Sequence, residues 1–186
     1  MSKQKLFLDF DNTIVDTMYA FCEQYNDIYK YNSNFKRANP KKVKHWNFKT
    51  QCPLQLGETE DLFSRKKLWE YMRLYSNAES SLKELSKKYD ITIISIGTAE
   101  NVAHKSIWIK QNLPMIKDVI LIRNEGVKMD KSSINMEGAT FVDDVKSNLD
   151  SSNASRKILF GKKYEWNKDW TGEWAKDWLD LYLRLK

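Results

Sequence analysis

Short apolar runs alternate with amphipathic stretches along most of this chain. The runs are bounded by polar residues and predict buried strands at residues 6–8, 91–94, 119–122, 138–142 and 157–161. Helices are predicted where apolar residues recur three and four positions apart, at residues 80–88 and 100–112. Val102, Ile107 and Trp108 are expected on the buried face of the second of these helices. Strands alternating with helices predict an α/β fold with a mostly parallel sheet and helices on both faces.

The stretch between the first and second predicted strands has a different pattern. Helical spacing covers residues 16–31 and 60–75, whereas residues 32–57 are rich in Asn, Lys and Pro and predict an irregular connection. We therefore expect a small, mostly helical cap over residues 17–76. The α/β core would then consist of residues 1–16 and 77–186.

Four tryptophans follow the last predicted strand at constant steps of four, at positions 166, 170, 174 and 178. This spacing keeps them on one side of a helix, although Gly172 interrupts the run. Together with Leu181 and Tyr182, they predict a C-terminal helix packed on the sheet. Anchoring in the core is the favoured role for these rings, and stacking on nucleic-acid bases is the alternative.

The first strand ends at two carboxylates, Asp9 and Asp11, which are separated by Phe10. Ligands bind at the carboxyl ends of strands in open parallel sheets, so both acids are expected in one pocket, with Phe10 directed into the core. Paired carboxylates suit Mg²⁺ binding and can divide the roles of nucleophile and general acid. The alternative is a strand end followed by a helix cap made by Asp11, Asn12 or Thr13.

Three further polar groups fall near other strand ends. Ser95 follows the second strand and precedes Gly97 and Thr98, a combination of hydroxyl and helix N-terminus that can hold phosphate. A lysine, Lys131 or Lys128, precedes the fourth strand, and Asp143 and Asp144 end that strand. Each alone has an ordinary explanation as a cap or a solvated side chain. Together at one edge of one sheet they indicate phosphoryl chemistry.

Composition narrows the function without defining it. The chain of 186 residues fits one domain, and its net charge of +6 suits an anionic ligand without the basic tracts of a dedicated nucleic-acid binder. Cys22 and Cys52 form no C-x-x-C motif and are expected as reduced thiols of a cytoplasmic protein. His45 and His104 stand alone, which argues against a zinc cluster or a histidine-based triad. No signal peptide or membrane span is expected.

The ordered set DFDNT, Ser95, lysine and FVDD resembles the four motifs of the haloacid dehalogenase-like phosphohydrolases. A closer resemblance, to the 5′(3′)-deoxyribonucleotidase family, covers most of the second half. It is carried by Lys105-Ser-Ile-Trp108-Ile, the strand DVILIR, Asp130-Lys131-Ser132, FVDD and the Trp-rich tail. This resemblance implies a three-layer core with a cap after the first strand, and it favours Lys131 over Lys128 as the motif lysine.

The resemblance also implies a mechanism. Asp9 would be the nucleophile that forms an aspartyl-phosphate, and Asp11 the general acid and base, with its pKa raised by the pocket. Mg²⁺ would be held by Asp9, the backbone carbonyl of Asp11 and Asp143, with Asp144 nearby. Ser95 and Lys131 would hold the phosphate oxygens.

The expected substrate is a small phosphorylated molecule, most consistent with a nucleoside monophosphate. Cap aromatics could stack on a base, and the candidates are Phe21, Tyr25, Phe35, Trp46 and Phe48. Basic residues within 36–44 could guide an anion. Alternatives are a phosphatase for sugar phosphates or for nucleic-acid 3′ ends. Outside this class, a phospho-receiver domain or a nucleotide-binding regulatory protein would also suit, although a receiver would carry an aspartate where this chain has Ser95.

Overall fold

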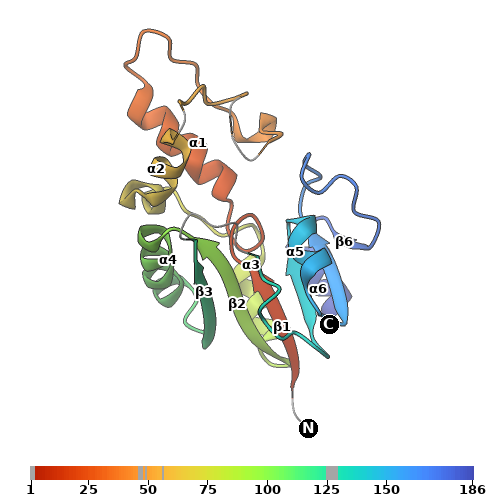
Figure 1. Cartoon of the computed structure of the whole chain (residues 1–186). Helices are drawn as coiled ribbons and strands as arrows, with labels where there is room; N and C mark the ends of the chain where they lie inside the picture. The colour runs from red at the N-terminus through yellow and green to blue at the C-terminus, as the bar shows by residue number, and fades with distance from the viewer. Residues whose placement is uncertain (1–2, 46–47, 49, 56, 125–129) are drawn as a thin grey trace.

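The computed structural model of the chain describes residues 3–45, 48, 50–55, 57–124 and 130–186. In this part of the chain, the strands form one parallel sheet in the order β3-β2-β1-β4-β5-β6 (Figure 1). The strands are β1 Gln4–Asp9, β2 Tyr89–Gly97, β3 Asp118–Arg123, β4 Thr140–Asp143, β5 Arg156–Phe160 and β6 Glu173–Ala175. The predicted α/β fold is confirmed, and β1, which ends at Asp9, lies inside the sheet with β2 and β4 as its neighbours.

Helices cover both faces of the sheet because successive side chains of each strand point to opposite sides. Leu6 and Leu8 of β1 join a core with α3, α4 and α6, whereas Phe7 between them packs in a second core with α5. These helices are α3 Ala78–Leu85, α4 Ala99–Asn112, α5 Lys146–Ser151 and α6 Trp178–Leu185. The resulting three layers bring the carboxyl ends of the strands to one edge, where a site is expected.

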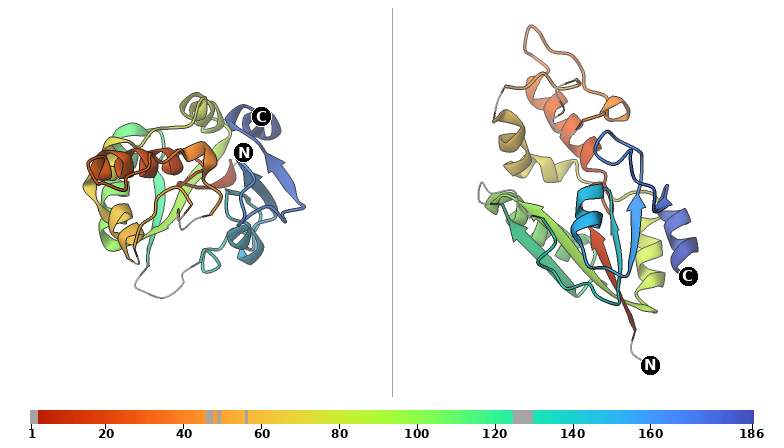
Figure 2. Two further views of the ribbon diagram at one scale, coloured as in Figure 1. Left: turned by 90° about the horizontal axis from the view of Figure 1, so that it is seen from above. Right: turned by 45° about the vertical axis from the view of Figure 1, so that its right-hand side comes forward.

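Residues 17–76 leave the sheet after β1, return before β2 and stand beyond the carboxyl ends of the strands (Figures 1 and 2). This region contains α1 Thr17–Tyr29, the 3₁₀ helix η1 Pro40–Lys42, α2 Glu58–Ser64 and the 3₁₀ helix η2 Lys66–Glu70. Its two ends lie side by side: Asp16 N donates to Arg73 O at 3.0 Å, and Tyr75 N donates to Ile14 O at 3.1 Å. We call residues 14–16 and 73–76 the crossing segments.

The prediction of one helix over residues 60–75 is wrong. The helical segment α2 ends at Ser64, and Arg65 is extended, with φ −71° and ψ 139°, before η2 begins. A tertiary contact accounts for the break. The Phe63 carbonyl, which would accept from residue 67 in a continuous helix, accepts instead from Asn101 Nδ2 of α4 at 2.8 Å. The Ser64 and Thr98 hydroxyls are also hydrogen bonded, at 2.9 Å.

The prediction of one Trp-rich C-terminal helix is wrong as well, since only residues 178–185 are helical. Trp174 lies in β6, a strand parallel to β5 that the sequence did not predict. Gly172 marks the change, because a Cβ there would come within 2.5 Å of the Trp170 ring. Each indole N–H then finds its own acceptor, as Trp178 does with Thr13 O at 2.8 Å. Trp178 is fully buried, and Trp166 and Trp170 pack partly buried against the two cores, which fits the favoured interpretation, whereas the Trp174 ring is 37% exposed.

Candidate active site

Asp9 and Asp11 both border a cavity of about 300 Å³ at the carboxyl edge of the sheet. Asp9 is the last residue of β1, and Phe10 beside it is fully buried. The Phe10 and Trp108 rings meet edge to face, with their centroids 5.6 Å apart. The prediction that Phe10 faces the core is therefore confirmed. Asn12 turns the chain with a positive φ of 53°, and its side chain accepts from Met18 N at 3.1 Å.

The structure brings the other predicted residues to the same place. Ser95, Lys131 and Asp144 line the cavity with the two acids. Asp143 is fully buried behind Lys131. Ser95 lies inside β2, which runs on to Gly97, and Thr98 caps α4 as expected by accepting from Asn101 N. Lys128, the alternative motif lysine, lies outside the described residues.

On the Asp9 side of the cavity, one lysine joins two carboxylates. The buried Lys131 ammonium contacts Asp9 Oδ1 and donates to Asp143 Oδ2 at 2.6 Å. Asp143 also accepts from Val145 N at 2.8 Å and Asn148 Nδ2 at 3.0 Å. These donors fix Asp143, whereas Lys131 is the one side chain within the described structure seen to donate to Asp9.

Burial and like charge dominate the electrostatics on this side. Burial, with help from the Asp143 and Asp11 charges, raises the pKa of Asp9 to about 7 against the opposing effect of Lys131. Burial and the neighbouring Asp143 and Asp9 also raise the pKa of Asp144 well above its usual range. Trp166 Nε1 donates to Asp144 Oδ2 at 3.3 Å. Three carboxyl groups share one lysine here, and the raised pKa values of two of them show that the buried cluster lacks positive charge, so it suits a cation.

On the Asp11 side, the carboxylate is surrounded by donors. Lys105 Nζ donates to Asp11 Oδ2 at 2.5 Å and to Ser95 Oγ at 2.6 Å. Ser95 Oγ donates to the same Asp11 oxygen at 3.1 Å, and Thr17 Oγ1 donates to the other at 2.9 Å. Burial raises the pKa of Asp11, but Lys105 and the hydroxyls outweigh it, so the pKa lies below its usual value. The expectation of a raised Asp11 pKa is therefore wrong for the substrate-free protein.

Lys105 is the site residue that the sequence did not assign. It is fully buried on α4, on the same face as Val102, Trp108 and Ile109. Ile107, expected on that face, is 56% exposed, so this part of the prediction is wrong. The available signal was a lysine on the buried face of an amphipathic helix, three residues before Trp108. Lysine is almost never fully buried without a partner, so this position indicated that Lys105 would have one.

A divalent cation fits the carboxylates of the Asp9 side. Oxygens of Asp9, Asp143 and Asp144 all lie within 4.8 Å of one another. Carboxylate oxygens are the ligands that Mg²⁺ prefers. The Asp11 side chain lies outside this group and binds Lys105 instead.

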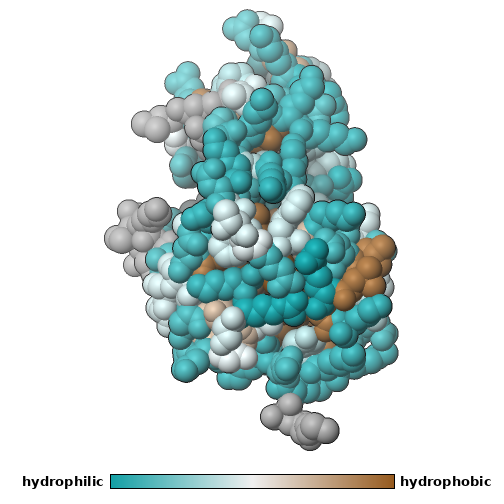
Figure 3. Space-filling view, turned by 90° about the vertical axis from the view of Figure 1, so that its right-hand side faces the viewer, coloured by the Kyte–Doolittle hydropathy of each residue, from teal (hydrophilic) through white to brown (hydrophobic). Residues whose placement is uncertain are grey.

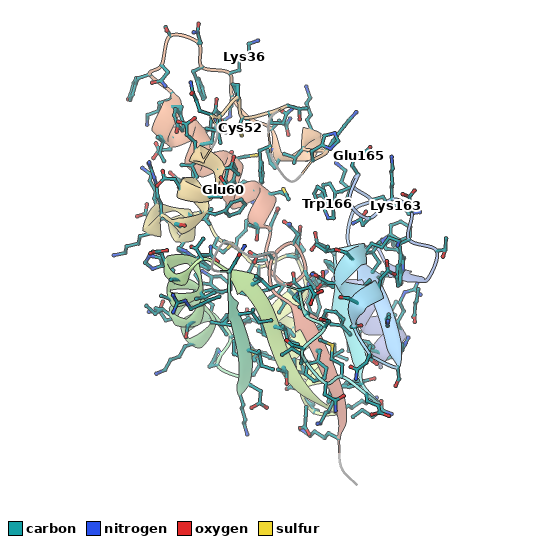
Figure 4. The ribbon with its side chains drawn as sticks, viewed as in Figure 1. Lys36, Cys52, Glu60, Lys163, Glu165 and Trp166 are labelled. Atoms are coloured by element: carbon teal, nitrogen blue, oxygen red, sulfur yellow. The ribbon has the colours of Figure 1, made fainter. Side chains whose placement is uncertain are left out.

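Most of the aromatic residues expected to stack on substrate form the interior of residues 17–76. Phe21 and Phe48 are fully buried and stack at 3.9 Å, and Tyr25 is 3% exposed. Phe35 packs against the same core, and Trp46 lies outside the described residues. The cavity is lined from this region by Glu60 and Phe63 of α2. Figure 4 shows Glu60 on α2 and Trp166 on the loop after β5. The Trp166 side chain is directed toward residues 17–76.

The first strand ends at two acids, the second carries a hydroxyl, and the fourth is preceded by a lysine and ends at two more acids. This order of groups places the protein among the haloacid dehalogenase-like phosphohydrolases. Residues 3–185 match the family described as 5′ nucleotidase, deoxy (pyrimidine), cytosolic type C, and the chain belongs to this family. It is therefore a phosphoric monoester hydrolase, and the resemblance expected from the motifs is confirmed.

Individual relatives agree with this assignment. A 5′(3′)-deoxyribonucleotidase of Clostridium acetobutylicum is 25% identical over 145 residues, which cover 74% of this chain and 78% of that protein. Two solved structures share the fold over both whole chains or nearly so. One is the HAD-hydrolase YfnB of Bacillus subtilis bound to magnesium, with a TM-score of 0.67, 14% identity and 100% of both chains covered. The other is the haloacid dehalogenase-like family protein SP0104 of Streptococcus pneumoniae, with a TM-score of 0.66, 13% identity and 99% of both chains covered.

Of the helices in the described part of the chain, none has the length and apolar character to span a bilayer.

Proposed function

We propose that this protein is a Mg²⁺-dependent 5′(3′)-deoxyribonucleotidase that hydrolyses nucleoside monophosphates through an aspartyl-phosphate on Asp9. The observation that carries the proposal is the placement of Asp9, Asp11, Ser95 and Lys131 around one cavity, beside three clustered carboxylates. The family description and the curated relative support the substrate class. The word cytosolic in that description and the two free cysteines favour a cytoplasmic location.

In the first step, an oxygen of Asp9 would attack phosphorus, and the bond between phosphorus and the ester oxygen would break. Asp11 would give the leaving oxygen its proton. In the second step, Asp11 would take a proton from water, whose oxygen attacks the phosphorus and frees Asp9 and inorganic phosphate. Ser95 and Lys131 would donate to phosphate oxygens throughout.

Asp9, Asp143 and Asp144 would hold Mg²⁺, with the Asp11 backbone carbonyl as a further ligand. The ion would supply positive charge that offsets the repulsion between the phosphate and Asp9. Lys131 contributes to the same end from the protein side, because its ammonium already contacts Asp9 and Asp143.

The lowered pKa of Asp11 is compatible with its role as an acid once substrate arrives. A phosphate beside Asp11 adds negative charge, and this raises the pKa of the carboxyl. Ser95 would turn its hydroxyl proton to the phosphate, which removes one of the donors that now stabilise the carboxylate. Asp11 would then keep Lys105 and Thr17 as its two fixed contacts.

We assign Lys105 as a positioning residue. Its ammonium has no exposed surface, and it contacts Asp11 Oδ2, Ser95 Oγ and, at 3.5 Å, Ile96 O. It therefore acts through Asp11 and Ser95, which it holds at a fixed distance from each other. We further propose that residues 17–76 act as a cap over the core formed by residues 1–16 and 77–186, with Glu60 and Phe63 facing substrate.

Phosphate release from nucleoside 5′- and 3′-monophosphates, sugar phosphates and a 3′-phosphorylated oligonucleotide tests the proposal, with Mg²⁺ and with EDTA. We expect release from deoxynucleotides that stops with EDTA. Release confined to sugar phosphates or to the oligonucleotide would transfer the assignment to those substrates. Absence of release from any of them would contradict it.

A further inference from the structure

A second cavity lies behind the crossing segments and shares no lining residue with the catalytic one. Its volume is about 390 Å³, larger than the 300 Å³ of the catalytic cavity. Its walls come from Lys41 of η1, from the crossing segments, from the loop after β5 and from the start of α6. We call it the hinge pocket. The side of the molecule that carries this loop, β6 and α6 is largely hydrophilic (Figure 3).

The hinge pocket is surrounded by more positive than negative charge. Lys41, Lys162, Lys176 and Arg73 line it, against the two acids Asp16 and Asp177. Asp16 is committed to the Arg73 guanidinium at 3.1 Å and to Tyr19 N, the cap of α1. Asp177 accepts from Asp180 N and caps α6. Both acids therefore serve local structure. Within the described residues none of the three lysines forms a salt bridge, although the Asp180 carboxylate, which accepts from Lys176 N at 3.1 Å, lies near Lys176.

The free polar groups of the hinge pocket are donors. Lys162 Nζ makes one hydrogen bond, to Lys41 O at 2.8 Å, whereas the Lys41 and Lys176 ammoniums make no hydrogen bond or salt bridge in the described structure. The Tyr75 and Tyr164 hydroxyls are likewise without a hydrogen bond there. Burial raises the pKa of both phenols, so each keeps its proton at neutral pH. Several ammonium and hydroxyl donors around one space suit a ligand with several anionic oxygens.

The remaining wall is apolar. Pro40, Tyr75 and Tyr164 line the pocket with partly exposed rings, whereas Phe160, Trp178 and Met18, which also line it, are each at most 2% exposed. Such a surface matches a ring better than a bare ion, because burial of apolar area adds to affinity. We propose that the hinge pocket is a second binding site, for a phosphate-bearing small molecule with an apolar or aromatic ring.

The location gives such a ligand a structural consequence. Lys41 belongs to residues 17–76, whereas Lys162 and Lys176 belong to the sheet side of the molecule, and the crossing segments lie between them. Among the described residues, two hydrogen bonds link the two parts across this gap, Lys162 Nζ to Lys41 O at 2.8 Å and Glu165 N to Lys44 O at 3.3 Å. A bound anion would add a third link between the two parts. The inference does not depend on the proposed catalytic function.

Calorimetric titration of the full chain with ADP in EDTA tests the proposal, with inorganic phosphate as a second probe. The double variant Lys41→Glu, Lys176→Glu removes two ammoniums from the pocket. Its matched control is Lys36→Glu, Lys163→Glu, which changes the net charge equally, and neither residue lines the pocket. Lys36 lies at the far tip of residues 17–76 and Lys163 on the loop after β5 (Figure 4).

We expect an ADP-binding component that is at least tenfold weaker in the pocket variant and unchanged within about twofold in the control. Phosphate alone should bind the same component more weakly than ADP. Equal loss in both variants would show that only long-range charge attracts the ligand, and it would overturn the proposal. ADP binding that is unaffected by the pocket variant would place all binding elsewhere and would also overturn it. All four residues are exposed, so unfolding is not expected, and a thermal melt of each variant checks this.

Discussion

Asp9 and Asp11 carry the same carboxyl group and border the same cavity, yet their surroundings move their pKa values in opposite directions. Asp9 lies beside Asp143 and Asp144, and burial, together with the Asp143 and Asp11 charges, raises its pKa to about 7 against the opposing effect of Lys131. Asp11 faces Lys105, Ser95 and Thr17, and these donors bring its pKa below the usual value despite burial. The difference between the two pKa values arises largely from neighbours that are distant in the sequence, such as Asp143 for Asp9 and Lys105 for Asp11.

The largest expected effect comes from removing the reactive group on the Asp9 side. Asp9→Asn should reduce phosphate release by at least about a thousandfold, since an amide cannot replace the nucleophile. The measurement is kcat with a nucleoside monophosphate and Mg²⁺. Asn is close in shape to Asp, and Lys131 keeps its contact with Asp143, so the melting temperature should confirm a folded protein. Activity within tenfold of the wild type would exclude Asp9 as nucleophile.

The next effect tests the Asp11 side. Lys105→Met keeps the length of the side chain but removes the donor to Asp11 and Ser95, and kcat on a nucleoside monophosphate should fall about a hundredfold. On p-nitrophenyl phosphate, whose leaving group needs little protonation, the loss should be less than about tenfold.

Lys110→Met on the exposed face of the same helix is the matched control and should be close to wild type. Equal losses on both substrates would indicate a purely structural role for Lys105. A wild-type enzyme inactive on both would instead contradict the proposed function, so the two failures are distinguishable.

A third effect concerns the raised pKa of Asp9. Mg²⁺ has to displace the proton of a carboxyl that is protonated below about pH 7 in the metal-free protein. Its affinity should therefore rise by at least tenfold per unit between pH 5 and pH 7, and it should keep rising above pH 7 because the pKa of Asp144, the second proposed ligand with a raised pKa, lies well above its usual range. Calorimetric titration with Mg²⁺ at several pH values measures this. An affinity independent of pH over that interval would show that Asp9 is not a ligand.

The smallest expected effect is the loss of one hydroxyl hydrogen bond to Asp11. Thr17→Val removes the donor to Asp11 Oδ1 while conserving volume, and should reduce kcat about fivefold, equivalent to about 1 kcal/mol. The value of KM should change less than kcat, because Thr17 does not line the cavity. A change in KM alone would place Thr17 in substrate binding instead.

The pattern of apolar runs was sufficient to predict most of the sheet and the edge at which the site lies. Strand ends are local features, so Asp9, Asp11, Ser95 and Asp144 could be placed near one another before their contacts were known, whereas Lys131 was chosen over Lys128 through the family resemblance. Their roles as catalytic and metal-binding groups remain predictions. Asp143 was expected with them. It is fully buried, and its carboxylate accepts a hydrogen bond from Lys131.

The failures share one physical cause, which is competition from distant partners. Asn101 takes the Phe63 carbonyl and ends α2, although local propensity favours a longer helix. Trp174 lies in β6, which pairs with β5 about fifteen positions earlier in the sequence, although the spacing of Trp174 from Trp170 and Trp178 is helical. Lys105 reaches Asp11 across 94 positions of sequence, and it reverses the direction of the expected pKa shift. No local pattern contains these partners.

The pairing of the crossing segments has a consequence for how this architecture can be changed. Asp16 and Arg73 are joined by a backbone hydrogen bond and an ion pair, so the 56 residues between them begin and end at nearly the same point in space. An insertion with adjacent ends can be shortened, replaced or exchanged for one from a relative without moving the strands on either side, because the cost of closing the connection changes slowly with its length. The sheet would keep its reactive edge, and a new insertion would bring a new selection of molecules to it.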